Sequence, residues 1–172
     1  MRTVIGNIWD YHDDKSALVI PINIGWKRDK TNAMGRGLAR QAALKYPELP
    51  SRVGTLCRLS GSAMHPSIIH LNHRSRQFIA FPSKPLNIEN PHLSWRGDAD
   101  YDLIRRGLDY MIKYSSSFAL TQRVLFPLVG CGNGGLLISE VLPLLDQLED
   151  EHFLLVVTPK DANIIRILKG AK

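Results

Sequence analysis

The chain has 172 residues, of which 44% are hydrophobic and 22% charged, and these proportions predict a single globular domain with its own core. No apolar run is long enough to span a bilayer, the first residues soon turn polar, and the two cysteines offer no disulfide framework, so we expect a cytoplasmic protein without a membrane segment or secretory signal. The formal net charge of +6 favours anionic partners such as nucleotides, phosphorylated compounds or nucleic acid, or serves solubility alone.

Apolar periodicity and capping residues predict strands that alternate with helices over much of the chain. In chain order the patterns predict a strand over 3–8, a strand over 16–24, a helix over 37–47, strands over 55–59, 67–72 and 77–82, a helix over 98–117, a strand over 123–129, a helix over 139–150, a strand over 152–159 and a helix over 161–170. Such alternation predicts α/β layers around a mixed sheet, with ligands at the carboxyl ends of the strands.

Several residues set the expected ends of these elements. The strand SALVIPINI, residues 16–24, is apolar almost throughout, as expected of a strand buried on both faces. Asp98 or Asp100 is expected to cap the helix over 98–117. Ser139 is expected to open the next helix, with Pro143 in about its first turn, and Asp161 to cap the last helix.

Two glycine-rich loops each join a predicted strand to a predicted helix. NAMGRG, residues 32–37, places two glycines just before a helix, and PLVGCGNGGL, residues 127–136, follows the strand RVLF. Bare amide groups in such loops can hold a phosphate, and two loops together can clamp one diphosphate from both sides; ordinary turns are the alternative. The first loop is neither a P-loop nor a complete dinucleotide fingerprint, because the required lysine and third glycine are missing.

Two polar residues come directly at the ends of predicted strands. Asn23 can hold a ribose hydroxyl through its amide, or it caps the strand through a local turn. Lys84, in FPSKP, lies between two prolines that stiffen its backbone; in a cleft it can act as a nucleophile or base, and otherwise it is a solvated surface charge. The histidines show no metal-ligand pattern and no serine elbow exists, so we expect neither a metal, nor a cofactor, nor a serine triad.

Several segments resemble those of macrodomains, in the same order and over nearly the whole chain. They are GNI, LVIPIN, MGRGLARQAALKYPEL, FPSK, WRGDADYDLIRRGL and PLVGCGNGGLLISEVLPLL. The resemblance is greatest to the branch of DNA ADP-ribosyl glycohydrolases, the antitoxin partners of DNA-ADP-ribosylating toxins. It implies one macrodomain over residues 1–172: an α/β three-layer sandwich with a mixed central sheet flanked by helices and ADP-ribose in a cleft at the strand ends.

The resemblance also implies roles for individual residues. Lys84 matches the catalytic lysine of the branch, and Asn23 matches a residue that orients the distal ribose. Ligand-binding positions are implied at Asn7, Ile8, Asn32, Met34, Gly35, Arg36, Gly37, Leu38, Pro127, Gly130, Cys131, Gly132, Asn133, Gly134 and Gly135. The chain departs from the family where Gly134 replaces the catalytic Asp of protein-directed relatives, where Asn7 replaces a frequent Asp, and where Ala99 replaces a serine of the branch.

Two segments stand out as insertions relative to the family, residues 26–31 and residues 85–94. The first, WKRDKT, puts Lys27, Arg28 and Lys30 beside Trp26. Cations can meet backbone phosphates and an indole can stack an unpaired base, so this segment is a candidate nucleic-acid contact; a solvated charged excursion is the alternative.

Together these features predict an ADP-ribosyl glycohydrolase that removes ADP-ribose from modified nucleobases in DNA. We expect a monomer that meets ADP-ribose or ADP-ribosylated DNA, with a DNA-ADP-ribosylating toxin as a partner in the same system. The alternatives are a reader that binds ADP-ribose without turnover, and a hydrolase acting on ADP-ribosylated protein or ADP-ribose 1''-phosphate. A nucleic-acid-binding module without an ADP-ribose site would leave the paired glycine loops unexplained.

Overall fold

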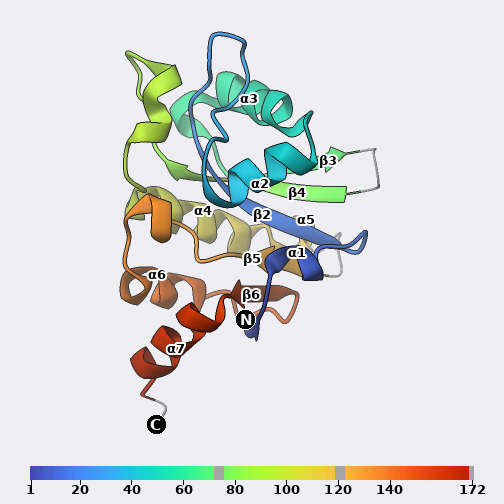
Figure 1. The fold of residues 1–172 in the computed structure, drawn as a ribbon, viewed down its shortest axis with the longest axis vertical. Helices are drawn as coiled ribbons and strands as arrows, with labels where there is room; N and C mark the ends of the chain where they lie inside the picture. The colour runs from blue at the N-terminus through green and yellow to red at the C-terminus, as the bar shows by residue number, and fades with distance from the viewer. Residues whose placement is uncertain (72–75, 119–122, 171–172) are drawn as a thin grey trace.

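The centre of the molecule is a mixed β-sheet (Figure 1). The computed structural model describes residues 1–71, 76–118 and 123–170, and within these residues the sheet has six strands in the order β1-β6-β5-β2-β4-β3. The strands are β1 (Arg2–Ile5), β2 (Ser16–Asn23), β3 (Ser67–Leu71), β4 (Arg76–Lys84), β5 (Arg123–Phe126) and β6 (Phe153–Val157). All neighbouring strands run parallel except β3, which pairs antiparallel with β4.

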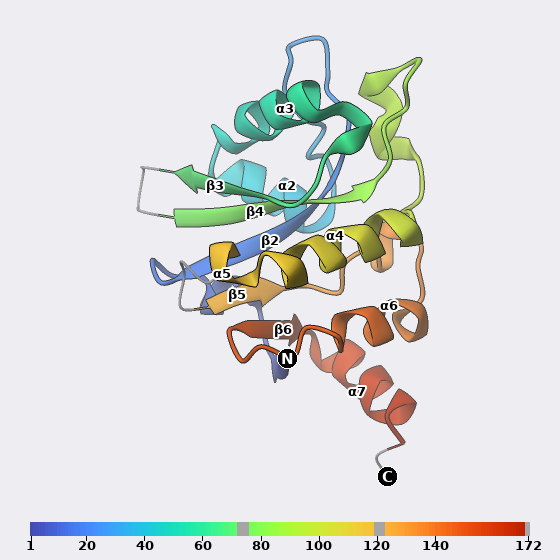
Figure 2. The same cartoon turned by 180° about the vertical axis from the view of Figure 1, so that it is seen from behind.

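Helices cover both faces of this sheet. They are α1 (Ile8–Tyr11), α2 (Gly37–Lys45), α3 (Leu49–Ser60), α4 (Tyr101–Lys113), α5 (Ser115–Phe118), α6 (Ile138–Leu145) and α7 (Pro159–Leu168), with the short 3₁₀ helices η1 (Gly61–Ala63), η3 (Pro91–Arg96) and η4 (Gly132–Gly134) in the connections. Figure 1 shows α1 and α2 in front of the sheet and α3 above β3 and β4, and Figure 2, seen from behind, shows α4 and α5 on the opposite face. The buried side chains of α3 belong to the same core as those of α2. The result is the three-layer α/β sandwich that the sequence predicts.

Side chains that alternate along β2 explain why both faces need a cover. Ala17 and Val19 pack with the core on the side of α4 and α6, whereas Leu18 and Ile20 pack with the core on the side of α2 and α3. All four side chains are 2% exposed or less. Because a strand projects successive side chains to opposite faces, a continuous apolar run requires burial on both.

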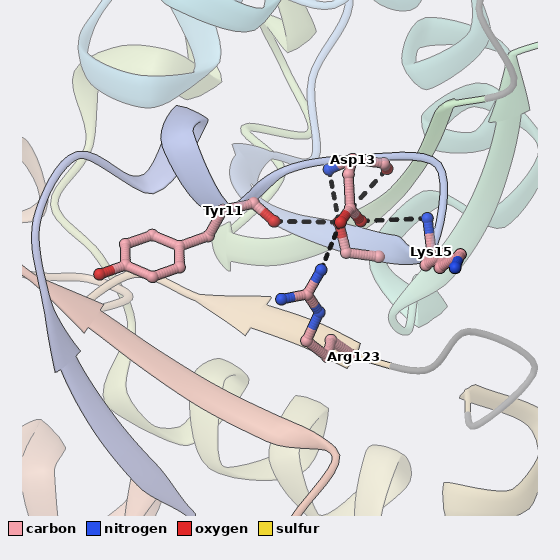
Figure 3. A network of polar contacts seen from close by, with 5 residues as sticks. Tyr11, Asp13, Lys15 and Arg123 are labelled. Carbon is pink, nitrogen blue, oxygen red and sulfur yellow. Dashed lines mark hydrogen bonds and ion pairs between the residues drawn. The ribbon is translucent and has the colours of Figure 1, made fainter.

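A polar network holds the beginnings of β2 and β5 together (Figure 3). Asp13 and Arg123 form an ion pair, the Oδ1 atom of Asp13 accepts from the Lys15 amide at 3.0 Å, and the buried Ser16 hydroxyl accepts from the Asp13 amide at 2.9 Å. Partial burial favours a higher pKa for Asp13, but these hydrogen bonds and the Arg123 charge hold the pKa below its usual value. Ser16 and Arg123 are also register partners, so the network lies at the end of the sheet where both strands begin.

The strand predicted over 55–59 is wrong, because these residues lie inside α3. Leu49, Val53 and Cys57 follow one another at intervals of four residues and are all buried. This spacing places them on one face of a helix, against the sheet. Leu59 is 81% exposed, so the apolar run was the end of a helical stripe rather than a buried strand.

The expected starts of two helices need correction. Helix α6 begins at Ile138, and the amide of Leu137 donates to Glu140 at 2.7 Å, so Ser139 does not open the helix and Pro143 lies in its second turn. Helix α7 is capped by Thr158, whose hydroxyl accepts from the Asp161 amide at 3.2 Å.

Asp100 does cap α4, as one of the two predicted candidates: its Oδ1 atom accepts from the Leu103 amide at 2.6 Å. The predicted strand over 3–8 is shorter than expected, since β1 ends at Ile5 and Ile8 begins α1. Asn72, predicted at the end of a strand, lies outside the described residues. Among the residues that the structure describes, no helix is long and apolar enough to cross a bilayer.

Candidate functional site

A cleft opens at the carboxyl ends of β2, β4, β5 and β6, where parallel strands place their following loops at one edge. Its narrow part has a volume of about 370 Å³ and its wide part about 1020 Å³, and the two parts share Leu38, Pro127, Leu128 and Cys131 in their walls. Ligands of α/β sheets bind at this edge, because the loops there are free to vary while the strands hold them in place. The cleft therefore lies at the ends of the strands, where the sequence analysis expects the ligand.

Most of the predicted site residues meet in this cleft. The narrow part is lined by Asn23, Asn32, Gly35, Arg36, Gly37, Leu38, Lys84, Pro127, Gly130, Cys131, Asn133 and Gly134 among the predicted residues, and the wide part by Asn7, Ile8, Leu38, Pro127, Cys131 and Gly132. Residues far apart in the chain are thus brought together by the parallel strand order.

A few predicted residues lie elsewhere. Met34 is 7% exposed and packs into the core beneath the first loop, and Gly135 lines neither part of the cleft. Trp26 is half-buried against the core, whereas the basic residues after it are exposed and also lie outside the cleft walls. The carbonyl of Lys30 lies so close to α3 that a Cβ at Gly54 would be 2.1 Å from it, so this inserted segment is packed down on the helix.

The two glycine loops approach each other across the cleft. A Cβ added at Gly37, at the start of α2, would lie 3.1 Å from the amide nitrogen of the Asn133 side chain in the second loop. At Gly35, by contrast, an added Cβ meets no atom within 4 Å, although the residue lines the narrow part. The backbone of the first loop therefore borders open space at Gly35, which is the arrangement expected where a ligand approaches bare amides.

Gly134 has a packing reason to be glycine. A Cβ at this position would lie 2.9 Å from the Ala99 Cβ, and the Ala99 amide donates to the Gly134 carbonyl at 2.8 Å. A side chain at Gly134 would therefore meet the residues before α4 first, rather than project into the cleft.

Asn23 is used as a support for the first loop. Its side-chain nitrogen donates to the Ala33 carbonyl at 3.2 Å, and its side-chain oxygen accepts from the Gly25 amide at 3.1 Å. The buried Asn32 completes the junction by donating to the carbonyls of Asn23 and Gly25, both at 2.8 Å. The local-turn interpretation of Asn23 is therefore confirmed, while its contact with a ribose stays a prediction.

Lys84 ends β4 and its ammonium group lies between the two sides of the cleft. The Nζ atom donates to the Asn133 carbonyl at 3.1 Å and to the Trp95 carbonyl at 3.3 Å. Burial lowers the pKa of Lys84 below its ordinary value, and the nearby charge of Arg36 acts in the same direction, while that of Asp98 opposes it. An amine with a lowered pKa is neutral more often near neutral pH, and a neutral amine is nucleophilic.

Nine residues that line the narrow part were not predicted as site residues, and three of them, Trp95, Arg96 and Asp98, have an aromatic or charged side chain. The guanidinium groups of Arg36 and Arg96 lie 5.6 Å and 5.4 Å from the centre of the Trp95 ring. In the sequence, Asp98 was interpreted only as a candidate cap of the helix over 98–117. The sequence feature nearest to them was the inserted segment 85–94, which ends directly before Trp95.

Cys131 lines both parts of the cleft and is a free thiol, half-buried. Burial raises its pKa to about 11, with further contributions from the charges of Asp161 and Glu140. The thiol is therefore protonated near neutral pH, which fits a wall residue rather than a nucleophile.

Comparison with known proteins shows similarity in structure rather than in sequence. No protein-family model and no curated protein sequence matches the chain. Among solved structures, the macrodomain of Mycobacterium tuberculosis DarG superposes with a TM-score of 0.67 at 22% identity, covering 90% of this chain and 95% of that one. The macrodomain of Thermus aquaticus DarG gives a TM-score of 0.70 at 22% identity, with 92% and 97% covered. Thermosipho africanus DarTG, in complex with ADP-ribose, gives 0.69 at 20% identity over 91% of this chain and 41% of that one.

The sheet order, the helices on both faces and these superpositions define the fold. The chain has the macrodomain fold, as the resemblance of its motifs predicted. At about one-fifth identity, the similarity to the DarG macrodomains establishes the fold alone, and the activity of this chain has to be argued from its own cleft.

Proposed function

We propose that this protein is an ADP-ribosyl glycohydrolase that removes ADP-ribose from modified nucleobases in DNA. The observation that carries the proposal is the position of Lys84, whose amino group is held by a carbonyl of the second glycine loop on one side and the carbonyl of Trp95 on the other. A surface lysine would be solvated, whereas this one is partly buried in the wall of a cleft and has a lowered pKa.

The shape of the cleft supports ADP-ribose as the ligand. We assign the diphosphate to the space between the two glycine loops, where Gly35 borders open space and α2 begins at Gly37. The first amides of a helix and its dipole both favour an anion there. The adenosine is assigned to the wide part beside Asn7 and Ile8, and the distal ribose to the narrow part that ends at Lys84.

The proposed chemistry acts on the bond between the anomeric carbon of the distal ribose and the base. Positive charge builds on that carbon as the bond breaks, and the departing base needs a proton. Lys84 is proposed to attack the anomeric carbon or to assist the leaving group, while binding energy from the diphosphate and adenosine holds the sugar in place. Water then completes the hydrolysis, so that the products are free ADP-ribose and the unmodified base.

DNA is favoured as the substrate over modified protein by two features. The second loop has Gly134 where protein-directed relatives carry a catalytic Asp, and the net charge of +6 suits a strand with further phosphates. The DarG macrodomains are among the structures to which the chain is similar. We propose a DNA-ADP-ribosylating toxin as the enzyme whose product this protein hydrolyses.

The test is turnover of three substrates by the wild-type protein and by Lys84→Ala. We expect release of ADP-ribose from modified single-stranded DNA in preference to modified protein or ADP-ribose 1''-phosphate, and we expect Lys84→Ala to abolish it. The variant should keep its affinity for free ADP-ribose within about tenfold, or about 1.4 kcal/mol, because the loops supply that binding.

Lys113→Ala is the matched control, since Lys113 is an exposed lysine at the end of α4 and distant in the fold from the cleft walls. Full turnover by Lys84→Ala would reject the lysine mechanism. Binding of ADP-ribose by the wild type without turnover of any of the three substrates would make the protein a reader.

A further inference from the structure

Two arginines and a tryptophan form an array at the mouth of the narrow part of the cleft; we call Arg36, Trp95 and Arg96 the guanidinium array. Arg36 belongs to the first glycine loop and precedes α2, whereas Trp95 and Arg96 come from η3. Both guanidinium carbons lie within 6 Å of the indole centre, at 5.6 Å and 5.4 Å. At this distance the negative face of the indole attracts both cations and holds them near the ring.

Within the part of the chain that the structure describes, no carboxylate lies within ion-pair distance of the array. Both arginines are exposed, and neither forms an ion pair with a residue that the structure describes. A guanidinium attracted to an aromatic ring keeps its N–H groups in its own plane, where they remain available to other acceptors. The array therefore offers two sets of hydrogen-bond donors that are positively charged and not engaged in an ion pair with a described residue.

The segment that carries Trp95 and Arg96 is firmly held. The buried Ser94 hydroxyl accepts from the Asn87 amide and donates to the Pro91 carbonyl, both at 2.9 Å. The backbone after β2 lies so close that a Cβ at Gly25 would be 2.1 Å from the Pro91 carbonyl oxygen. A site built on such a segment loses little conformational freedom when it binds, so its contacts are preorganised.

The array lies at the reacting end of the cleft. The Trp95 carbonyl accepts from the Nζ atom of Lys84 at 3.3 Å, whereas Asn7 and Ile8 line the opposite, wide part. If ADP-ribose extends from the wide part to Lys84, the group to which it is attached leaves the cleft beside the array.

We propose that the guanidinium array is the docking site for the DNA strand, and that Arg36 and Arg96 each bind a backbone phosphate next to the modified nucleotide. Trp95 is a positioning residue that holds the two cations. The proposal rests on the proposed function for the identity of the ligand in the cleft. Phosphodiesters fit better than an acidic peptide, because a planar guanidinium binds phosphate oxygens through two parallel hydrogen bonds and successive phosphates recur along a strand.

The experiment measures the binding of a single-stranded oligonucleotide that carries ADP-ribose on one base, as a function of salt, in the Lys84→Ala background to prevent turnover. Each phosphate contact on a single strand makes log affinity fall by about 0.7 per unit of log salt. We expect Arg96→Gln to reduce this slope by about 0.7 and Arg36→Gln with Arg96→Gln to reduce it by about 1.4. The affinity of Arg96→Gln for free ADP-ribose should change less than about twofold, since its proposed partner is a phosphate of the strand.

Trp95 is tested by substitutions that separate positioning from folding. Trp95→Leu should reduce the slope as the double arginine variant does, and Trp95→Phe, which keeps an aromatic face, should restore most of it. Thermal unfolding of each variant verifies the fold. A Trp95→Leu slope equal to that of the wild type would overturn the positioning role.

Two further variants test whether the guanidinium array, rather than another basic surface, contacts the strand. Arg52→Gln, an exposed arginine in the first turn of α3, is the matched control and should leave the slope unchanged. Joint replacement of Lys27, Arg28 and Lys30 by Gln tests the other basic segment; a slope that responds to this triple variant and not to Arg96→Gln overturns the array proposal.

The same assays distinguish failure of this proposal from failure of the proposed function. Absence of binding to free ADP-ribose, or absence of turnover in the wild type, rejects the proposed glycohydrolase whatever the slopes are. If modified DNA is turned over normally and the salt slopes do not change when residues of the array are substituted, the docking site is rejected. The proposed glycohydrolase activity is then still supported. Equal loss of binding to an ADP-ribosylated peptide in Arg96→Gln would also overturn the choice of a nucleic acid.

Discussion

The amino group of Lys84 lies between charges of opposite sign. Burial and Arg36 both lower its pKa, whereas Asp98, which lines the same part of the cleft, raises it. If the neutral amine is the reactive form, the rate rises as pH increases through the pKa of Lys84. The charges of Arg36 and Asp98 therefore shift, in opposite directions, the pH at which the proposed reaction sets in.

For the proposed hydrolysis, we predict opposite shifts of the pH–rate profile in two variants. Asp98→Asn removes the charge that raises the pKa of Lys84, so the rising limb of kcat should move to lower pH. Arg36→Gln removes a charge that lowers this pKa, so the limb should move to higher pH. Measuring kcat from pH 5 to 10 on modified DNA checks both; a limb that moves in the same direction in both variants would contradict this account.

The open space at Gly35 provides a steric test of the proposed diphosphate site. Gly35→Ala and Gly35→Val should leave the free energy of unfolding within about 0.5 kcal/mol, because an added Cβ meets no protein atom within 4 Å. We expect affinity for ADP-ribose to fall with side-chain size, by about tenfold or more for Val, as measured by calorimetry. Gly97→Ala is the control, since its Cβ would make an ordinary contact of 3.9 Å and the residue lies outside the cleft walls. Unchanged affinity in Gly35→Val would place the diphosphate elsewhere.

Single residues of the site differed in how far the sequence revealed them. Both glycine loops, Asn23 and Lys84 could be singled out because glycine clusters, strand-end amides and proline-flanked lysines are visible locally. Trp95, Arg96 and Asp98 carry no such local signal. Their place in the cleft depends on how the inserted segment before them packs against the backbone at Gly25, which is a tertiary contact.

The beginnings of the helices show why capping residues are hard to choose from sequence. Several Ser, Thr and Asp side chains near one boundary can cap a helix, and the packing of the helix decides which of them does. Thr158 caps α7 although Asp161 was the predicted cap, because the strand before the helix ends at Val157 and the helix begins at Pro159.

We predict that Thr158→Ala lowers the free energy of unfolding by about 1 kcal/mol, the usual cost of losing a capping hydroxyl. The Thr158 hydroxyl accepts from the Asp161 amide and donates to its carboxylate at 2.7 Å, and both bonds are lost. Ser139→Ala, at an exposed position inside α6 that does not cap it, should change stability by less than about 0.5 kcal/mol. Urea unfolding of both variants is the measurement, and a larger effect at Ser139 would reverse the assignment of the caps.

Strands and helices as elements were mostly predictable, with one clear error. The long apolar run of β2 fits a strand buried on both faces, and the spacing of apolar residues in α4 fits an amphipathic helix, so each pattern indicates one type of element. Residues 55–59 were mistaken for a strand because a short apolar run is compatible with the period of a strand and with that of a helix. The helical spacing is recognisable only when Leu49 and Val53 are included.

At the scale of the whole molecule, buried His12 couples stability to pH. Its ring lies edge-on to Phe78 at 4.9 Å, and burial lowers its pKa from 6.5 to about 4, although a hydrogen bond to the Gln77 carbonyl opposes the shift. Between these two values the unfolded chain binds more protons than the folded one. Stability therefore falls as the pH decreases from about 6.5 to about 4.

We predict a loss of about 2–3 kcal/mol in the free energy of unfolding between pH 7 and pH 4 from this residue. Urea unfolding at several pH values measures it, with His12→Gln as the comparison, because glutamine keeps a donor for the Gln77 carbonyl but does not titrate. The variant should have a flatter pH dependence than the wild type over this range. Parallel curves would show that His12 is not the responsible group.

The layered α/β architecture followed from the alternation of elements, but the strand order did not. A pattern of strands and helices is compatible with many orders, and the choice of β1-β6-β5-β2-β4-β3 is made by contacts between strands distant in sequence. The resemblance to macrodomains implied a mixed sheet between helices and a cleft at the strand ends, but no strand order was predicted from it.

The protonation state of the Cys131 thiol affects how readily the wall of the cleft is oxidised or alkylated. Hydrogen peroxide and alkylating reagents attack the thiolate, and a thiol with a pKa of about 11 exposes very little thiolate near neutral pH. An easily oxidised sulfur between the two parts of the cleft would gain oxygen atoms where a ligand has to lie. The half-buried and protonated thiol of Cys131 should therefore react slowly with such reagents near neutral pH.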